Sequence, residues 1–247
     1  MLRKLFALPL LLLSAQSMAT VIVQGLNEEK EGWVAQVAGS YAETTGVTEK
    51  TAYGVSYSTE YNNGLNQFRS HGGITYNETN GSLISDNQLV HLRYVRKELA
   101  GPLRGEFFYQ NQSNDVNLVA SRELIGGGLS YRDLNEQLSY HVMVGVMNEQ
   151  EEHLTDDSLN RDVDRLSIST QLQWTFKSKN RLNVVIYHQP NISEFDDYRT
   201  TFVSTLIVPL GERTDINFSY SNNMNTTPFG DIPKRSTNFE TSISYSF

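Results

Sequence analysis

The 247-residue sequence contains no cysteine, which excludes disulfides, thiol nucleophiles and thiolate metal sites. Beyond its first twenty residues it also has no apolar run approaching the roughly 20 residues of a transmembrane helix. Basic residues are in the minority, 20 Lys and Arg against 28 Asp and Glu, and their scatter argues against nucleic acid as a partner. What is plentiful is Tyr and Phe among small polar residues, a mixture typical of strands with aromatic girdles.

The first nineteen residues have the pattern of a secretory signal peptide. A short basic start at Arg3 and Lys4 precedes an apolar run over residues 5–13, and Ser17 and Ala19 supply small residues for cleavage. We expect residues 1–19 to be removed, residues 20–31 to form a short periplasmic segment, and residues 32–247 to form one domain. The expected location is the outer membrane of a Gram-negative bacterium.

The last eleven residues alternate strictly between apolar and polar. Positions 239, 241, 243, 245 and 247 form a mostly apolar, aromatic row, and the positions between them are polar. A period of two predicts a strand with one face in lipid and one in a polar interior. In a barrel this strand would close the sheet by pairing with the first strand, placing Phe247 near Gly32 and Trp33. The terminal Phe247 also resembles the signal read by the barrel-assembly machinery.

The same alternation predicts eleven more strands, and so a closed, antiparallel, all-β transmembrane barrel of 12 strands. The expected strands lie near residues 33–41, 53–61, 68–76, 90–94, 103–109, 125–131, 138–146, 166–176, 182–186, 202–208, 216–220 and 239–247. The phase is weakest in the sixth strand and in the ninth, where Val185 and Tyr187 compete with Ile186 for the outer face.

The connections between these strands alternate in length. Tight turns are expected near residues 62–64, 99–102, 133–136, 177–180 and 209–212. Longer polar loops are expected near residues 43–50, 77–87, 113–117, 149–161, 190–197 and 222–235. Bacterial barrels keep short turns in the periplasm and longer loops outside, so five turns and six loops fit twelve strands with both termini in the periplasm.

Polar residues of the opposite parity should line the interior. The predicted lining residues are Glu60, Arg69, His71, His91, Arg93, Arg104, Glu106, His141, Arg165, Arg199 and Glu240, with Arg122 if the phase of the sixth strand holds. Six arginines then face three glutamates, while many acids, among them Glu149, Glu151 and Asp197, are assigned to outer loops. Two interpretations stay open: a structural ion-pair network that fills a narrow barrel, or uncompensated arginines that attract small anions into a narrow pore.

Hydrolase alternatives rest on two histidines. His188 near the outer end of the ninth strand could belong to a phospholipase-like site, and His153 with Asp156 and Asp157 superficially fits a protease-like site or a weak cation site. No serine has a distinctive context, and a solvated acidic loop explains the second group. The run Gly126–Gly128 lies in a strand, so it predicts bending or close packing of the wall rather than a phosphate loop.

Residues 107–132 resemble a known family. Phe107-Phe108-Tyr109-Gln110-Asn111-Gln112-Ser113-Asn114-Asp115, then residues 118–122, then Leu124-Ile125-Gly126-Gly127-Gly128-Leu129-Ser130-Tyr131-Arg132 are similar to the core of the salt-induced outer-membrane proteins, also called domain of unknown function 481. Residues 46–50, with Val47 in place of the usual Asn, and the tail with Pro228, Pro233 and Lys234 are similar as well. The resemblance covers roughly residues 32–247. It implies an outer-membrane barrel whose expression is linked to salt or other stress, and it supplies no catalytic residue.

Taken together, the sequence predicts a non-enzymatic outer-membrane barrel with no catalytic residue, cofactor or metal. The first functional hypothesis is a narrow channel for small, anionic solutes, and the alternatives are a plugged structural or stress-response barrel and an outer-membrane hydrolase. The expected partners are outer-membrane lipid and lipopolysaccharide, the barrel-assembly machinery through Phe247, and small anionic solutes.

Overall fold

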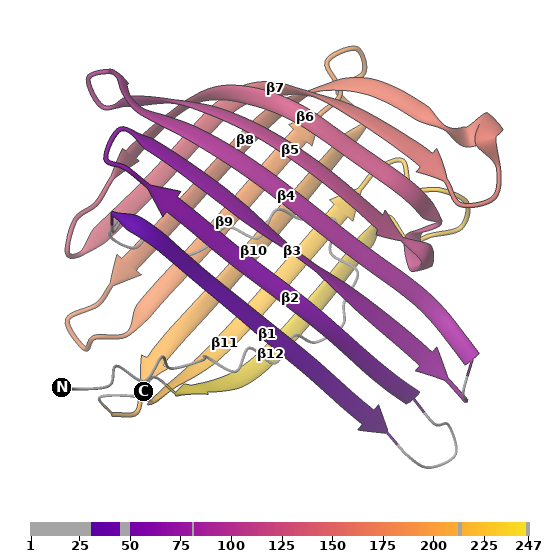
Figure 1. Cartoon of the computed structure of the whole chain (residues 1–247), viewed down its shortest axis with the longest axis horizontal. Coiled ribbons are helices and arrows are strands. Elements are labelled where there is room, and N and C mark those ends of the chain that lie inside the picture. Colours follow the sequence, from indigo (N-terminus) through magenta and orange to yellow (C-terminus); the bar gives the residue numbers. More distant parts are fainter. Residues whose placement is uncertain (1–30, 45–49, 81, 212–213, 246–247) are drawn as a thin grey trace.

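The computed structural model describes residues 31–44, 50–80, 82–211 and 214–245. They form twelve strands in a single sheet whose spatial order is the sequence order, with every neighbouring pair antiparallel (Figure 1). The strands are β1 (Gly32–Thr44), β2 (Lys50–Asn62), β3 (Asn66–Thr79), β4 (Ser82–Ala100), β5 (Leu103–Asn114), β6 (Val119–Asp133), β7 (Leu138–His153), β8 (Arg161–Thr175), β9 (Arg181–Pro190), β10 (Tyr198–Pro209), β11 (Thr214–Asn225) and β12 (Arg235–Tyr245). Two short 3₁₀ helices, η1 (Asp115–Asn117) and η2 (Asp157–Leu159), lie in connections.

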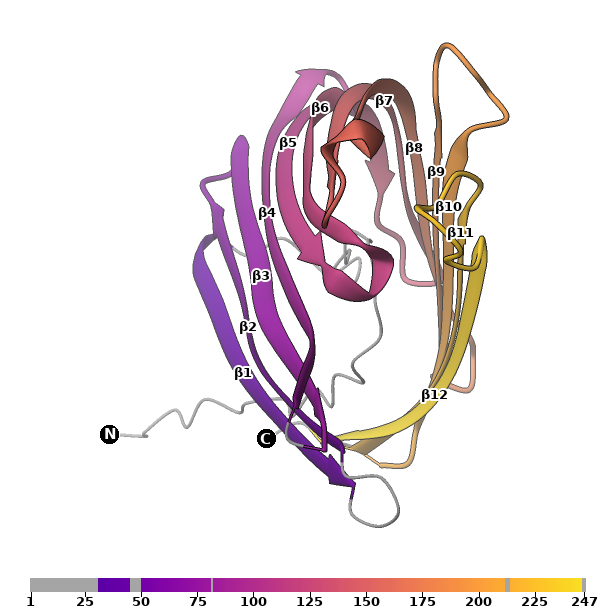
Figure 2. The ribbon, with the colours of Figure 1, turned by 90° about the vertical axis from the view of Figure 1, so that its right-hand side faces the viewer.

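The sheet is strongly curved and has β1 and β12 as its two edges (Figure 2). Among the described residues, no hydrogen-bonded ladder joins β12 to β1. Closure of the barrel therefore stays a prediction. So does the position of Phe247 beside Gly32 and Trp33, because residues 246–247 lie outside the described part, as do the signal peptide (1–19) and most of the segment 20–31.

Exposure along the strands follows the predicted alternation. Large apolar side chains such as Val55, Phe107 and Val146 are exposed on the convex face, and Trp33 is 73 % exposed. The inward and outward faces of β6 and β9 were the hardest to assign from the sequence, and they also follow the prediction. Ile125 and Ile186 are exposed, while Tyr187 is buried. Within the described residues, no helix is long and apolar enough to cross a membrane.

The strands are longer than the sequence pattern predicts, and this corrects the loop assignment. β3 reaches Thr79 and β4 starts at Ser82, so the long loop predicted at 77–87 is wrong. Polar residues continue the ladder there, with Asn77 opposite Ser85 and a bulge after Asn77. For the same reason β7 extends to His153 and includes Glu149 and Glu151, which were assigned to a loop. A change from apolar to polar residues on the outward face shows where the apolar surface ends. It does not show where the strand ends.

All five connections predicted to be short link the strands at one end of the sheet, called here the turn end, and the remaining connections lie at the opposite, loop end (Figure 1). The predicted close packing at Gly126–Gly128 is confirmed. A Cβ on Gly128 would lie 2.3 Å from the carbonyl oxygen of Val144 on β7, so only glycine lets β6 and β7 approach this closely.

Candidate functional site: the interior of the curved sheet

The concave face of the sheet carries the candidate site. The described strands form a single sheet. A side chain on its concave face is therefore buried only where other side chains of the same face cover it. Of the predicted lining residues, His91, Arg93, Glu106 and Arg165 are buried, and Glu60, Arg69, His71, Arg104, His141 and Arg199 are half-buried. Arg122 is buried as well. The side chain of Glu240 lies outside the described part of the chain.

Toward the turn end, carboxylates pair with the predicted cations of β3, β4 and β7. Arg69 donates from Nε to Oε2 of Glu60 at 3.2 Å. Arg93 donates from Nη1 to Oε2 of Glu106 at 3.0 Å, while Nε2 of His141 lies 2.7 Å from the other oxygen of the same carboxylate. Each arginine here has its own acid, so this group carries no uncompensated arginine charge.

An apolar layer lies on the same face. Phe108, Leu124, Met143 and Met147, from three adjacent strands, form one buried cluster. The guanidinium of Arg93 lies 5.6 Å from the centroid of the Phe108 ring. This layer brings the concave side chains of β5, β6 and β7 into contact and fills that part of the interior.

Toward the loop end, arginines from three strands converge on one fully buried carboxylate. Glu149 on β7 is 0 % exposed. It accepts hydrogen bonds from Nε of Arg122 on β6 at 2.8 Å and from Nε of Arg165 on β8 at 3.0 Å, and Nη2 of Arg199 on β10 lies 3.3 Å away. A buried carboxylate needs such partners because its desolvation cost is large.

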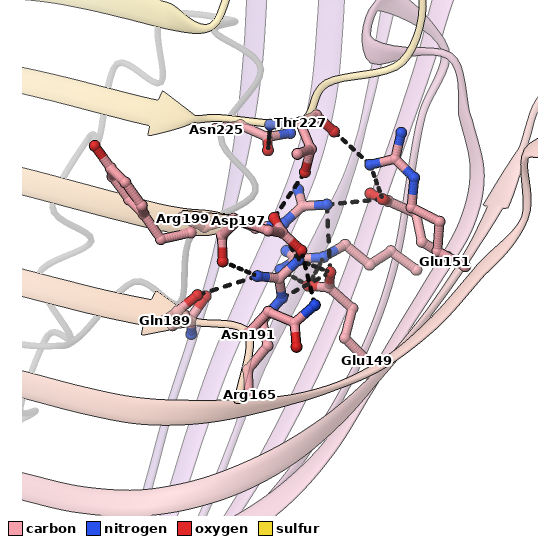
Figure 3. Close-up of polar contacts among 12 residues, drawn as sticks. Glu149, Glu151, Arg165, Gln189, Asn191, Asp197, Arg199, Asn225 and Thr227 are labelled. Carbon is pink, nitrogen blue, oxygen red and sulfur yellow. Dashed lines mark hydrogen bonds and ion pairs between the residues drawn. The ribbon is translucent and has the colours of Figure 1, made fainter. Parts of the chain in front are cut away.

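Two outer connections are tied into this network (Figure 3). Asp197, at the end of the β9–β10 connection, accepts from Nη2 of Arg165 at 3.1 Å and from the hydroxyl of Thr227 in the β11–β12 connection at 2.7 Å. Nearby, Arg199 donates to Glu151 at 2.7 Å, and Arg161 donates to the carbonyl oxygen of Thr227.

An aromatic ring from the β11–β12 connection packs against the same group of side chains. Phe229 is only 3 % exposed. The guanidinium of Arg161 lies 4.2 Å from its ring centroid, and the ring of His153 meets it edge-on at 4.8 Å. We call Arg122, Glu149, Glu151, Arg161, Arg165, Asp197, Arg199, Thr227 and Phe229 the loop-end plug.

The plug corrects the predicted charge balance of the interior. Glu149, Glu151 and Asp197 were assigned to outer loops, and the structure buries all three among the arginines. Every arginine of the plug therefore lies beside at least one carboxylate, so the interpretation in which these arginines have no acidic partner is wrong, although four arginines share three carboxylates. The signal for two of the acids was in the sequence, since positions 149 and 151 continue the inward parity of His141 and Met143 along β7. Asp197 lies in a connection, where no periodicity could place it.

Asp197 lies outside the strands, and its surroundings perturb its acidity. Burial opposes ionisation, but the hydrogen bond from Thr227, the charge of Arg165 and the hydrogen bond from Asn191 together hold the pKa of Asp197 below its ordinary value. The ionised carboxylate is thus the form that ties the two connections to β8.

This lowered pKa predicts a loss of stability in acid. A carboxyl group whose pKa is lower in the folded state stabilises the fold above its unfolded pKa, and this contribution is lost as the pH falls through the folded pKa. Wild-type protein should therefore be more stable than Asp197→Asn at neutral pH, and the two should converge at strongly acidic pH. Urea unfolding across the pH range measures the difference, and a gap that stays constant into acid would contradict the assignment.

The two histidines of the hydrolase alternatives have ordinary structural contacts. Nδ1 of His188 lies 2.8 Å from the hydroxyl of Thr200, with no serine in that contact. Nδ1 of His153 accepts hydrogen bonds from the backbone N–H groups of Thr155 and Asp156, at 3.2 and 3.1 Å. The carboxylate of Asp156 accepts from Ser158 at the start of η2, so it is engaged in capping that turn.

Comparisons with known proteins identify a family. A family model described as "Protein of unknown function, DUF481" matches residues 37–247. No curated protein matches the chain. Among solved structures, it is similar to a CymD monoaromatic hydrocarbon channel, with 9 % identity and a TM-score of 0.48 over 89 % of this chain and 80 % of that one. It is also similar to the β-domain of the Bordetella autotransporter BrkA, with 14 % identity and a TM-score of 0.35 over 87 % of this chain and 98 % of that one.

Proposed function

Since the chain belongs to the DUF481 family, whose description assigns no activity, we propose its role from its geometry: a non-enzymatic outer-membrane barrel closed at rest by the loop-end plug. The observation that carries the proposal is the full burial of Glu149 among Arg122, Arg165 and Arg199. An open aqueous pore would leave these groups hydrated, whereas here they cover one another and hold two outer connections inside.

A lipid environment for the convex face is supported by its exposed apolar side chains. In water, an apolar surface that extends around a whole sheet would be a severe aggregation liability, whereas lipid solvates it. Lipid also has no donors or acceptors for a free strand edge, so we propose that β12 pairs with β1 to close the barrel. Lipopolysaccharide and the barrel-assembly machinery, acting through Phe247, remain the proposed partners, and salt-linked expression remains a prediction.

Recording from the purified, folded protein in planar bilayers tests the closed state. We expect wild-type protein to give no steady conductance, only rare openings, because the plug spans β6 to β10 and both outer connections. A stable, open conductance from most inserted wild-type molecules would contradict the proposal. Heat-modifiable migration on a gel should establish beforehand that the inserted protein is folded.

The second candidate is the narrow channel for small anionic solutes, reached when the plug loosens. The observation that favours it is the charge of the plug, in which four arginines face three carboxylates. Arginine forks suit carboxylate and phosphate groups. In this reading the plug is a gate, and the excess positive charge is what an entering anion would meet.

A further inference from the structure

The concave face carries a row of cations at the turn end, away from the loop-end plug. Lys97 on β4, Arg104 on β5 and Arg132 on β6 lie near the turn ends of three neighbouring strands, and we call them the cation row. All three continue the inward parity of their strands, since the buried residue two positions further into the sheet is, in turn, Val95, Glu106 and Ser130. Like charges on neighbouring strands repel one another, so this row favours an acidic group beside it.

The rim of the interior beside this row is buried. Asn62, Gln67 and Lys97 lie at the turn ends of β2, β3 and β4 and are 2, 1 and 7 % exposed. Nζ of Lys97 donates to Oδ1 of Asn62 at 2.7 Å, so these side chains partly cover one another. The connection from β2 to β3 is a tight turn, too short to fold inward as the outer connections do. Further cover for this rim is therefore expected from elsewhere in the chain.

The chain enters β1 next to this rim. Gly32, the first residue of β1, has a φ of +94°, a conformation that favours glycine, so the backbone bends there. Oε1 of Glu31 lies 3.4 Å from the place that a Cβ on Gly64 of the β2–β3 turn would occupy. In the same turn, the carbonyl oxygen of Leu65 accepts the backbone N–H of Lys97 at 2.8 Å. The residues before Glu31 thus start beside β4, the first strand of the cation row.

The segment ahead of β1 has the charge and the length to reach the row. Its last four residues are three glutamates, Glu28, Glu29 and Glu31, and one lysine. Neighbouring strands lie about 4.8 Å apart, and an extended chain advances about 3.3 Å per residue, so the three steps from Glu31 back to Glu28 span roughly two strand spacings. That distance leads from the β2–β3 turn to β5. Residues 21–23 are apolar, and burial in the interior would remove them from water.

We propose that residues 20–30 dock on the concave face at the turn end, with Glu28 and Glu29 against the cation row. These residues are the ones that the predicted cleavage after residue 19 leaves ahead of β1. Charge-assisted hydrogen bonds hold the acidic half of the segment, and the apolar half lies deeper in the interior. The segment covers the mouth at the turn end, while the loop-end plug closes the other mouth.

Disulfide cross-linking tests the docking, because the chain has no cysteine of its own. Leu26→Cys and Asn27→Cys, used one at a time, keep all three glutamates, and each is combined with Lys97→Cys on the concave face. We expect mild oxidation of the folded protein to join the segment to position 97 within one chain. The matched control uses Arg96→Cys, which lies one position away and on the opposite face of β4, and its cross-link yield should be at least about 10-fold lower.

Charge reversal separates docking on the row from chance proximity. Glu28→Lys with Glu29→Lys keeps the length of the segment but repels the row, and it should lower the cross-link yield to position 97 at least about 5-fold. Should Lys97→Cys prevent folding, Gln67→Cys with Phe68→Cys as its control repeats the comparison on β3.

Four results would overturn the proposal. Equal yields on the two faces of the strand, or a yield that charge reversal leaves unchanged, would show that the segment does not dock on the row. Cross-links that join two chains, seen as dimers on a gel, would assign the rim to a second copy. A folded protein that forms no cross-link at all would leave the row to soluble anions. None of these readouts depends on whether the barrel conducts.

Discussion

Replacing Arg165 with alanine should lower the free energy of unfolding by about 3–5 kcal/mol. Its guanidinium is fully buried and contacts Glu149 at 3.0 Å and Asp197 at 3.1 Å, and it also donates to the carbonyl oxygen of Gln189 at 3.2 Å. Removing it takes one cationic partner from each of two buried carboxylates, Glu149 and Asp197, and it removes the ion pair that holds the β9–β10 connection to β8. Urea unfolding in lipid vesicles, followed by tryptophan fluorescence, measures the loss.

An exposed ion pair provides the matched control. Arg181 on β9 pairs with a single carboxylate, that of Asp215 at 3.2 Å, and its side chain is 40 % exposed. Arg181→Ala should therefore cost no more than about 1 kcal/mol. Arg165→Lys should fall between the two, because a lysine keeps the charge but cannot reproduce the forked contacts. Equal losses for Arg165→Ala and Arg181→Ala would mean that the plug contributes little to stability.

The strands were predictable because lipid and a filled interior impose opposite demands on alternate residues. The outward row of β7, through Val142, Val144 and Val146, is legible in the sequence for this reason, and the described strands match it. Strand ends were less predictable. Near Asn77 and Glu149 the outer face becomes polar while the ladder continues, so polarity was mistaken for a loop.

The interior was predictable as a set of residues and not as a set of contacts. Period-two counting could name Arg93, Glu106 and Arg165, but which acid meets which arginine depends on the tilt of the strands and on how the connections fold. Asp197 and Phe229 illustrate the limit. Nothing local to either polar connection indicates that it returns to the interior, and yet Asp197 links the β9–β10 connection to β8 and Phe229 links the β11–β12 connection to it.

Releasing both connections from the interior should open the barrel to anions. In the double variant Asp197→Ala with Phe229→Ala, Thr227 loses its carboxylate partner and Arg161 loses the ring against which it lies at 4.2 Å. The remaining charges of the plug are four arginines and two glutamates. We expect a steady conductance that wild-type protein lacks, with a reversal potential shifted toward that of chloride in a salt gradient.

The salt dependence and a matched variant make this result specific. The Debye length falls to about 3 Å at 1 M salt, so the anion preference should weaken as the salt concentration rises. Phe195→Ala alters an exposed phenylalanine of the β9–β10 connection and should leave the barrel closed. If the double variant folds but shows no conductance, the barrier to ions lies deeper, at the layer of Phe108, Leu124, Met143 and Met147. That result would favour a permanently plugged barrel over a gated one.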